Sequence, residues 1–440
     1  MNLNIFTALK PLHIDGRKEA SSHASILELP EQAKPFIYIP LVGPNGVDID
    51  LKVALGDKVS VGQMVGIRKD MYVPFFSSVS GKIIDKVDQY HPIVGRAVPH
   101  FVIENDHQYK EQFPLKPLSK QPNREQIIQQ IKEGGLTGLG GSGFPTYFKY
   151  QSAKDVEYVL INGVECEPYL STDYQAAQLY AEEVMKGSEY FRIAANAQKV
   201  IIAFKQTKVA IKEALEPFFK DYPNIEIRSV PDVYPMGWER TLVRTVLHRE
   251  YDKFPLEAKV IVSNLTSAIA LHQLVVYGKP VTERILTLSG AGLHQEVNVK
   301  VPVGMLMSDV VKAIGGYAMD AVTAFIGGPM SAKAVKDDRF SIQPHFGGFT
   351  VLAPISSQEE TCLRCGACTS NCPANLQPIE IKLALDSQNT ARLLKLDAMK
   401  CVECGICTYV CPSKIEVTEA VRLGKTKTRI ELAKQVVKAS

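Results

Sequence analysis

The sequence predicts a multidomain protein of the α/β class, and three observations support this expectation. The chain has 440 residues, which is too long for a single compact core and suits roughly three or four domains of ordinary size. Short apolar strands dominate the amino-terminal part, whereas helical and strand patterns alternate in the middle. Eight of the nine cysteines lie between Cys362 and Cys411, so we expect the carboxyl-terminal part to form a module of its own.

The composition is that of an ordinary soluble globular chain, with 45% hydrophobic and 22% charged residues. A formal net charge of +3 argues against a nucleic-acid-binding protein that relies on neutralising phosphates. No apolar run approaches the roughly 20 residues that cross a bilayer. The amino terminus also lacks the charged lead and apolar core of a secretory signal. We therefore expect a cytoplasmic protein.

Two cysteine runs, "CLRCGACTSNCP" and "CVECGICTYVCP", share the spacing C-x2-C-x2-C-x3-C-P. In this spacing three cysteines of a run bind one [4Fe–4S] cluster and the fourth binds the other cluster. Zinc sites more often use two separated C-x2-C pairs, and disulfides do not suit the compartment. The sequence therefore predicts two sets of metal ligands: Cys362, Cys365, Cys368 and Cys411 for one cluster, and Cys401, Cys404, Cys407 and Cys372 for the other.

The segment between the two runs, "PIEIKLALDSQNTARLLKLDAMK", has helical patterning and predicts two helices between the cluster loops. Two clusters in one small module suit the passage of single electrons. Cys166 lies outside both runs and is expected to be a loop or core thiol.

The amino-terminal part alternates short apolar strands with Gly-Asp and Ser-Gly turns, which predicts a small all-β unit. Its pieces "GDKVSVGQ" and "SSVSGKI" resemble the two halves of a lipoyl-type barrel-sandwich domain. A lipoyl-type function would need a modifiable lysine at the hairpin tip between them, where Lys69 is the available residue. We favour a structural role for this unit. The proline-containing stretch "EQFPLKPLSKQPNREQ" then predicts a linker that ends near residue 124.

The middle of the chain has the pattern of a parallel α/β sheet. An amphipathic helix, "NREQIIQQIKEGG", precedes the glycine-rich loop "GLTGLGGSGFPTYFKY". The strand "VEYVLING" then runs into the acidic turn "VECEPYLSTDY", and ligands of such sheets bind at the carboxyl ends of strands. The glycine loop by itself is compatible with a nucleotide site and with an ordinary turn.

Four segments in order carry a family resemblance: "GLGGSGFPTYFKY", "INGVECEPYLSTDY", "YPMGWERTL" and "SNLTSAIALHQLVVYGKPVTERILTLSG". Together they resemble the RnfC subunit of the Rnf electron-transport complex and, more distantly, the flavin- and NADH-binding subunit of respiratory complex I. The amino-terminal β unit and the "CVECGICTYVCPSKI" ending follow the same order, so the likeness covers nearly the whole chain.

The resemblance implies a domain order. It gives a barrel-sandwich β domain at 1–112, a Rossmann-like FMN- and NADH-binding α/β domain at 124–280, a small ubiquitin-like SLBB domain at 281–345 and a two-cluster ferredoxin-like α domain at 350–420. A basic helix at 421–440 follows, which could dock on a membrane partner or present a solvated face. The SLBB domain is expected to serve as a spacer and docking surface. Its stretch "AFIGGPMSA", which follows the segment from Glu283 to Gly316, is either a phosphate loop or an ordinary turn.

The resemblance also implies site residues for FMN and NAD(H). The cofactor-binding residues would be Gly138, Gly140, Gly141, Gly143, Lys149, Asn162, Glu165, Asn264 and Thr266. The catalytic residues would be Phe144 near the nicotinamide, Glu167 as an acid near the flavin, and Glu239 as a contact of the dinucleotide ribose. Flavin suits this position because it accepts a hydride and releases electrons singly.

Two residues depart from the relatives. The complex I subunit has an aspartate at the position of Val164, whereas the Rnf proteins are apolar there. Trp238 occupies a position that is glycine or an acid in similar sequences. Its indole could fill the dinucleotide site, stack on an aromatic ring or point outward, and NADH binding is more sensitive to it than flavin binding.

The function expected from this resemblance is electron exchange between NAD(H), through FMN, and two [4Fe–4S] clusters. The chain would be a peripheral, cytoplasmic-side subunit of an Rnf-type ferredoxin:NAD+ oxidoreductase coupled to ion transport. Its partners would be membrane subunits and a ferredoxin-like subunit. Two alternatives remain open, namely a stand-alone reductase for a corrinoid or selenoenzyme system and a flavin-free adaptor that relays electrons between clusters.

Overall fold

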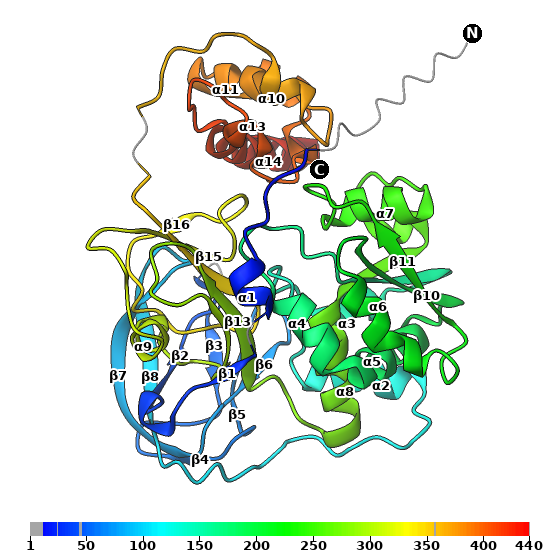
Figure 1. Cartoon of the computed structure of the whole chain (residues 1–440), viewed down its shortest axis with the longest axis vertical. Coiled ribbons are helices and arrows are strands. Elements are labelled where there is room, and N and C mark those ends of the chain that lie inside the picture. The colour runs from blue at the N-terminus through cyan, green and yellow to red at the C-terminus, as the bar shows by residue number, and fades with distance from the viewer. Residues whose placement is uncertain (1–11, 24, 44–45, 356–357, 440) are drawn as a thin grey trace.

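The computed structural model describes residues 12–23, 25–43, 46–355 and 358–439, with side chains to residue 435 (Figure 1). Residues 1–11 of the expected amino-terminal domain and Ser440 of the expected last helix lie outside the described residues. The described residues form a mixed α/β protein with four sheets. Within the described ranges, no helix is both long and apolar enough to cross a membrane.

The amino-terminal β unit, which we call the barrel unit, consists of two small sheets. One has the order β2-β8-β7-β4 and the other β3-β5-β6. The strands are β2 (Phe36–Pro40), β3 (Ile49–Leu51), β4 (Lys58–Val59), β5 (Met64–Arg68), β6 (Pro74–Phe76), β7 (Gly81–His91) and β8 (Arg96–Asn105). Lys69 is exposed in the turn after β5.

A second sheet unit, which we call the third unit, follows the α/β region in sequence and packs against the barrel unit through one shared apolar core. Its elements are β13 (Glu283–Ser289), β14 (Val297–Pro302), α9 (Met307–Ala313), β15 (Thr323–Ile326), β16 (Ala334–Val335) and β17 (Gly348–Leu352). The short β1 (Leu27–Glu28) pairs in parallel with β14, and α1 (Glu19–His23) precedes it. The amino-terminal segment therefore joins this sheet and not those of the barrel unit.

The central α/β unit has a four-stranded parallel sheet in the order β11-β10-β9-β12. Its strands are β9 (Tyr158–Asn162), β10 (Lys199–Lys205), β11 (Ile225–Val230) and β12 (Val260–Asn264). Its helices are α2 (Arg124–Glu133), α3 (Thr146–Gln151), α4 (Thr172–Leu179), α5 (Ala181–Ala195), α6 (Val209–Leu215), α7 (Glu239–Leu247) and α8 (Leu265–Tyr277). Separate apolar clusters cover the sheet's two faces, which explains the continuous apolar runs of its strands.

Local sequence accounts for several boundaries of this unit. Asn123 begins α2 with a capping box in which its side chain accepts from the Gln126 backbone and Gln126 bonds back. Asn264 caps α8 by accepting from the Thr266 backbone N–H. The glycine-rich loop ends where α3 begins at Thr146.

The carboxyl-terminal module, which we call the cysteine module, is helical. It contains α10 (Ala367–Ser370), α11 (Pro378–Asp386), α12 (Thr390–Lys395), α13 (Ile406–Tyr409) and α14 (Val417–Ala439). The two helices expected between the cysteine runs are α11 and α12. The last helix begins earlier than residue 421, because Val417 and Val421 are buried with Ile381 and Leu393 in the module's own core.

Candidate functional site

A cavity of about 850 Å³ lies at the carboxyl edge of the parallel sheet. Its volume falls within the range of small-molecule and cofactor sites, about 300–1,000 Å³. Four parts of the chain line it, and the barrel unit contributes Pro92 and Ile93. The α/β unit contributes the glycine loop, the ends of β9 and β12 and the start of α7; the third unit contributes residues 326–328, 331–335 and 345–347; and the cysteine module contributes Glu403 and Arg422.

The glycine loop packs directly against the start of α8. A Cβ on Gly140 would lie 2.9–3.0 Å from the Asn264 side chain, so a larger residue would displace the loop. The Leu139 N–H donates to Ser267 Oγ over 3.1 Å. Gly141 has a φ of +100° and no neighbour where a Cβ would stand, which leaves its backbone open to the cavity.

Asn162 and Asn264 end adjacent parallel strands and are register partners. The Asn162 Nδ2 donates to the Gly237 carbonyl over 2.7 Å, and the Asn264 Nδ2 donates to Asp173 Oδ2 over 2.7 Å. Thr266 lies behind this wall, where its N–H and hydroxyl both donate to Asn264 Oδ1. Thr266 is therefore a capping residue of α8 and is not among the residues that line the cavity.

The acidic turn places a buried charge cluster at the cavity. Glu165 Oε1 accepts from the Asp173 backbone N–H over 2.9 Å, and Lys18 Nζ donates to the Glu165 carbonyl over 2.6 Å. Burial, and then the neighbouring Glu165, raise the pKa of Asp173 to about 7. Burial lowers the pKa of Lys18 to about 8.

Glu167 connects the cavity to the loop "GGPMSA". Its Oε1 accepts from the backbone N–H groups of Met330 and Ser331 over 2.8 and 2.9 Å, and its Oε2 accepts from the Tyr234 hydroxyl over 3.1 Å. Burial raises the pKa of Glu167. A Cβ on Gly328 would lie 2.0 Å from Glu167 Cγ, so glycine allows this approach. These two N–H groups bind an internal carboxylate, which argues against the phosphate interpretation of the loop.

Lys149 and Glu239 face each other across the cavity wall. Their Nζ and Oε2 atoms are 3.6 Å apart, and Lys149 also donates to the Val262 carbonyl over 2.9 Å. Glu239 is the first residue of α7, where a negative charge is favourable, and it accepts from the Tyr251 hydroxyl over 3.2 Å.

Besides Thr266, two expected residues do not line the large cavity. Phe144 is 39% exposed, meets Phe148 edge to face and is not among the residues that line the large cavity. Gly143 borders a smaller adjoining cavity instead. The other expected residues all line the large cavity: Gly138, Gly140, Gly141, Lys149, Asn162, Glu165, Glu167, Glu239 and Asn264.

Trp238 lines the large cavity and packs on the cysteine module. Its side chain is half-buried and contacts the cluster formed by Tyr234, Cys404 and Ile406. The Trp238 indole therefore does not point outward into solvent.

The second set of cysteines lines a single small cavity. Cys372 from the first run joins Cys401, Cys404 and Cys407 there, which is the exchange that the spacing predicts. Backbone N–H groups point at two of the sulfurs, from Leu376 to Cys372 over 3.4 Å and from Glu403 to Cys401 over 3.3 Å. Such N–H···S contacts are typical of iron–sulfur sites.

The first set lies nearer the surface, and Cys365 is exposed. In the described part of the chain, no three His, Cys, Asp or Glu side chains converge on a position for a single metal ion. A [4Fe–4S] cluster spreads four thiolates around a larger body. Cysteine thiolates are the donors that such clusters use.

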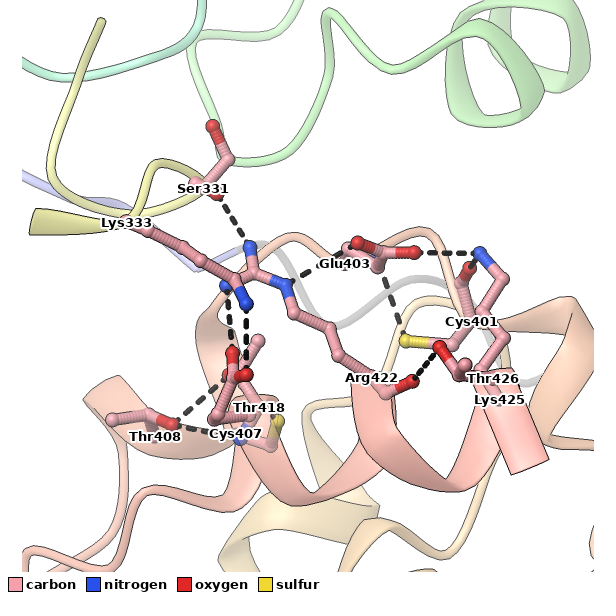
Figure 2. Close-up of polar contacts among 11 residues, drawn as sticks. Ser331, Lys333, Cys401, Glu403, Cys407, Thr408, Thr418, Arg422, Lys425 and Thr426 are labelled. Carbon is pink, nitrogen blue, oxygen red and sulfur yellow. Dashed lines mark hydrogen bonds and ion pairs between the residues drawn. The ribbon is translucent and has the colours of Figure 1, made fainter. Parts of the chain in front are cut away.

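A polar network ties the cysteine module to the large cavity, as Figure 2 shows around Arg422. Arg422 donates to the Ser331 carbonyl and, through Nε, to Glu403 Oε2 over 3.2 Å. Lys425 Nζ donates to the Cys401 carbonyl and to Glu403 Oε1, both over 2.8 Å. The cavity wall and the cysteine loop are thus linked by charged hydrogen bonds.

Family models match three parts of the chain. A Nuo51 FMN-binding domain matches residues 131–273, an RnfC barrel sandwich hybrid domain matches residues 7–108, and a 4Fe-4S dicluster domain matches residues 361–415. The fold, the cavity and these matches define an electron-transfer subunit of the flavin and iron–sulfur class.

Several curated proteins are similar over most of their length. The C subunit of the proton-translocating ferredoxin:NAD(+) oxidoreductase complex of Clostridium ljungdahlii is 28% identical, covering 83% of this chain and 82% of that protein. The Na(+)-translocating counterpart of Acetobacterium woodii is 29% identical, covering 87% and 88%. The C subunit of the ion-translocating oxidoreductase complex of Rhodobacter capsulatus is 29% identical, covering 90% and 78%. The chain is therefore RnfC-like and is an oxidoreductase subunit.

Among solved structures, an air-oxidized NAD+-reducing [NiFe]-hydrogenase shares 16% identity at a TM-score of 0.49, covering 69% of this chain and 63% of that one. A likeness this weak supports no functional inference.

The structure adds cavity residues that the sequence did not suggest. All but one of them lie more than a hundred residues after the glycine loop in sequence. The five residues are Asp173, Arg284, His345, Glu403 and Arg422. Asp173 belongs to the acidic turn "VECEPYLSTDY" that follows β9, so its position after a parallel strand is a signal that could have identified it.

Proposed function

We propose that the chain exchanges electrons between NAD(H) and two [4Fe–4S] clusters through FMN. One observation carries the proposal: the large cavity within the FMN-binding match shares its wall with the loop that bears Cys401, Cys404 and Cys407. Glu403 belongs to both cavities. A donor bound in the first cavity would thus lie beside the acceptor held in the second.

The residues present fit a flavin nucleotide. A wide cavity, a glycine loop open at Gly141 and the amino terminus of α8 suit a planar ring with a phosphate. When bound, FMN supplies the exchange between two-electron hydride chemistry and single-electron transfer. Asn162, Glu165 and Lys149 would bind and orient it, and Glu239 would contact the dinucleotide.

The proposed cluster ligands are the two sets predicted from the spacing. The set with Cys372 lies beside the flavin cavity, whereas the set with Cys362 lies nearer the surface. This order suits passage of electrons from an inner to an outer site.

The relatives support a role inside a larger assembly, because each is named as the C subunit of an oxidoreductase complex. We infer that membrane subunits of an Rnf-type complex and a ferredoxin-like subunit are the partners. The chain would lie on the cytoplasmic side, attached to the membrane through them, and its electron transfer would be coupled to ion transport.

Anaerobic purification with flavin and iron quantification tests the proposal. We expect bound FMN together with iron and sulfide for two clusters, and bleaching of the flavin on addition of NADH. Full iron content without FMN would favour the flavin-free adaptor. Flavin that NADH does not bleach, but dithionite does, would favour the stand-alone reductase with another donor.

A further inference from the structure

Arg284 is a buried cation in the wall of the flavin cavity, and it comes from β13 of the third unit. Its residue is 5% exposed. Nη2 donates to the Leu139 carbonyl over 3.2 Å and to the Phe346 carbonyl over 3.3 Å, and Nε approaches the same Phe346 oxygen at 3.4 Å. In the described part of the chain, Nη1 has no hydrogen-bond partner.

The charge of Arg284 is only partly compensated inside the protein. Among the described residues, Asp173 is the one carboxylate whose attraction reaches it. Asp173 is hydrogen-bonded to Asn264, and burial raises its pKa to about 7. Burial lowers the pKa of Arg284 to about 10, so it stays cationic at neutral pH. A buried cation is costly without an anionic partner.

The position of Arg284 indicates which anion it would bind. The Leu139 carbonyl that it contacts belongs to the glycine loop, and the Leu139 N–H is bonded to Ser267 in the first turn of α8. The loop, the amino terminus of this 13-residue helix and the guanidinium therefore meet at one corner of the cavity. Helix amino termini and arginine forks both favour phosphate.

His345 lies at the same corner. Its ring stands 3.3 Å from where a Gly143 Cβ would lie, and it lines the flavin cavity. Neither ring nitrogen has a hydrogen-bond partner among the described residues. Burial, followed by the nearby Arg284, lowers the pKa of His345 to about 4, so the neutral ring keeps one N–H donor.

We propose that Arg284, with His345 as a second donor, binds the phosphate of FMN. The third unit then completes a site whose other walls belong to the FMN-binding match at residues 131–273. This inference rests on the proposed function, because it assigns residues to the flavin that the function requires. Nη1 and the imidazole N–H supply the new contacts.

Binding of FMN and of riboflavin, which lacks the phosphate, tests the assignment. Both ligands are titrated into deflavinated full-length protein under anaerobic conditions, with flavin fluorescence as the readout. Arg284→Gln is expected to weaken FMN about 10- to 100-fold, the range for hydrogen bonds to a charged group, and to leave riboflavin unchanged. Arg284→Lys keeps the charge without the fork and is expected to lose less. His345→Leu is expected to weaken FMN severalfold by the same comparison.

Lys300→Gln is the matched control, since Lys300 is a cation of the neighbouring strand β14 that is paired with Glu283 and is not among the residues that line the cavity. It should leave both affinities unchanged. Equal losses of FMN and riboflavin in Arg284→Gln would mean that Arg284 only braces Leu139, and unchanged FMN binding would mean that it has no ligand. If Arg284→Gln binds FMN normally and only its affinity for NADH decreases, this corner of the cavity binds the dinucleotide instead. Each of these three results contradicts the role of Arg284 and leaves the proposed function standing. Wild-type protein that binds no FMN would contradict the proposed function as well.

Discussion

The Tyr234 hydroxyl lies 2.7 Å from the backbone oxygen of Cys404. The same hydroxyl is 3.1 Å from Glu167 Oε2, so one buried side chain touches both the cysteine loop and an acid of the flavin cavity. Cys404 is among the proposed ligands of the inner cluster. The Tyr234 hydroxyl is therefore a direct polar connection between the two proposed redox sites.

Tyr234→Phe is expected to destabilise the protein by about 1–3 kcal/mol, because the Cys404 carbonyl loses a donor in a buried place. Chemical denaturation of the anaerobic protein measures the free energy of unfolding. We also expect a shift in the EPR-monitored reduction potential of one cluster, since hydrogen bonding near the ligands tunes it. Tyr72→Phe removes a hydroxyl bonded to Glu133 away from the cysteines and should leave both cluster potentials unchanged. An unaltered pair of potentials in Tyr234→Phe contradicts the role assigned to this contact.

Arg422→Gln is expected to slow reduction of the clusters by NADH without loss of flavin or iron. Arg422 joins Ser331, at the flavin cavity, to Glu403 in the cysteine loop, and a small displacement of the loop reduces the rate steeply. Electron transfer slows as the distance between donor and acceptor grows, so we expect a slower cluster step. Stopped-flow absorbance separates bleaching of the flavin from reduction of the clusters.

The control for Arg422 is Lys333→Gln, which breaks an exposed pair with Glu419 across the same interface. Exposed pairs contribute only about 0–1 kcal/mol, so cluster reduction should stay at the wild-type rate. Slower flavin bleaching in Arg422→Gln, with an unchanged cluster step, would place Arg422 at the donor site instead.

Trp238→Gly is expected to destabilise the protein by roughly 2–4 kcal/mol while NADH affinity stays within about twofold of wild type. The indole packs on Tyr234, Cys404 and Ile406, and removal of this half-buried aromatic side chain leaves a gap in that packing. Denaturation gives the stability, and the NADH dependence of flavin bleaching gives the affinity. Trp238→Phe should retain most of the stability. A tenfold gain in NADH affinity in Trp238→Gly would show instead that the indole obstructs the dinucleotide.

Asp173→Asn is expected to flatten the pH dependence of stability. Burial raises the pKa of Asp173 from 3.8 to about 7, so between these values the folded chain holds a proton that the unfolded chain releases. Stability therefore decreases as pH rises from about 4 to 7. The variant should gain stability at pH 8 relative to wild type and gain little at pH 4.

Thermal unfolding of the flavin-free protein at the two pH values checks this expectation. Glu125→Gln serves as the control, because Glu125 is an exposed acid of α2 whose side chain is 75% exposed. It should shift both melting temperatures by the same small amount. An Asp173→Asn variant that loses stability at pH 8 would contradict the assignment of a buried, unfavourable charge.

Much of the local structure could be predicted because its causes are local. The helix before the glycine loop has its capping box at Asn123 and Gln126, within four residues of sequence. The apolar runs of β9 and β12 predict buried parallel strands, and the residues after such strands meet at one edge. Asn162 and Asn264 lie together at that edge.

Other features followed from packing between units. Phe144 was expected at the nicotinamide, but it contacts Phe148 outside the wall of the large cavity, because the loop turns before α3. The loop "GGPMSA" resembled a phosphate loop by composition. Its N–H groups bind Glu167, a residue more than a hundred positions earlier, and no local pattern indicates that pairing.

The sequence by itself determined the cysteine spacing, the alternation of helices and strands in the middle of the chain and the glycine loop, since each is a local pattern. The tertiary structure decided that Arg284, His345, Glu403 and Arg422 line the flavin cavity. These residues come from the third unit and the cysteine module. Contacts between units, such as the packing of Tyr234 on Cys404 and the bond from Arg422 to Ser331, hold the module at the cavity. Burial then decides their chemistry, because a guanidinium removed from water requires an anion that composition alone does not reveal.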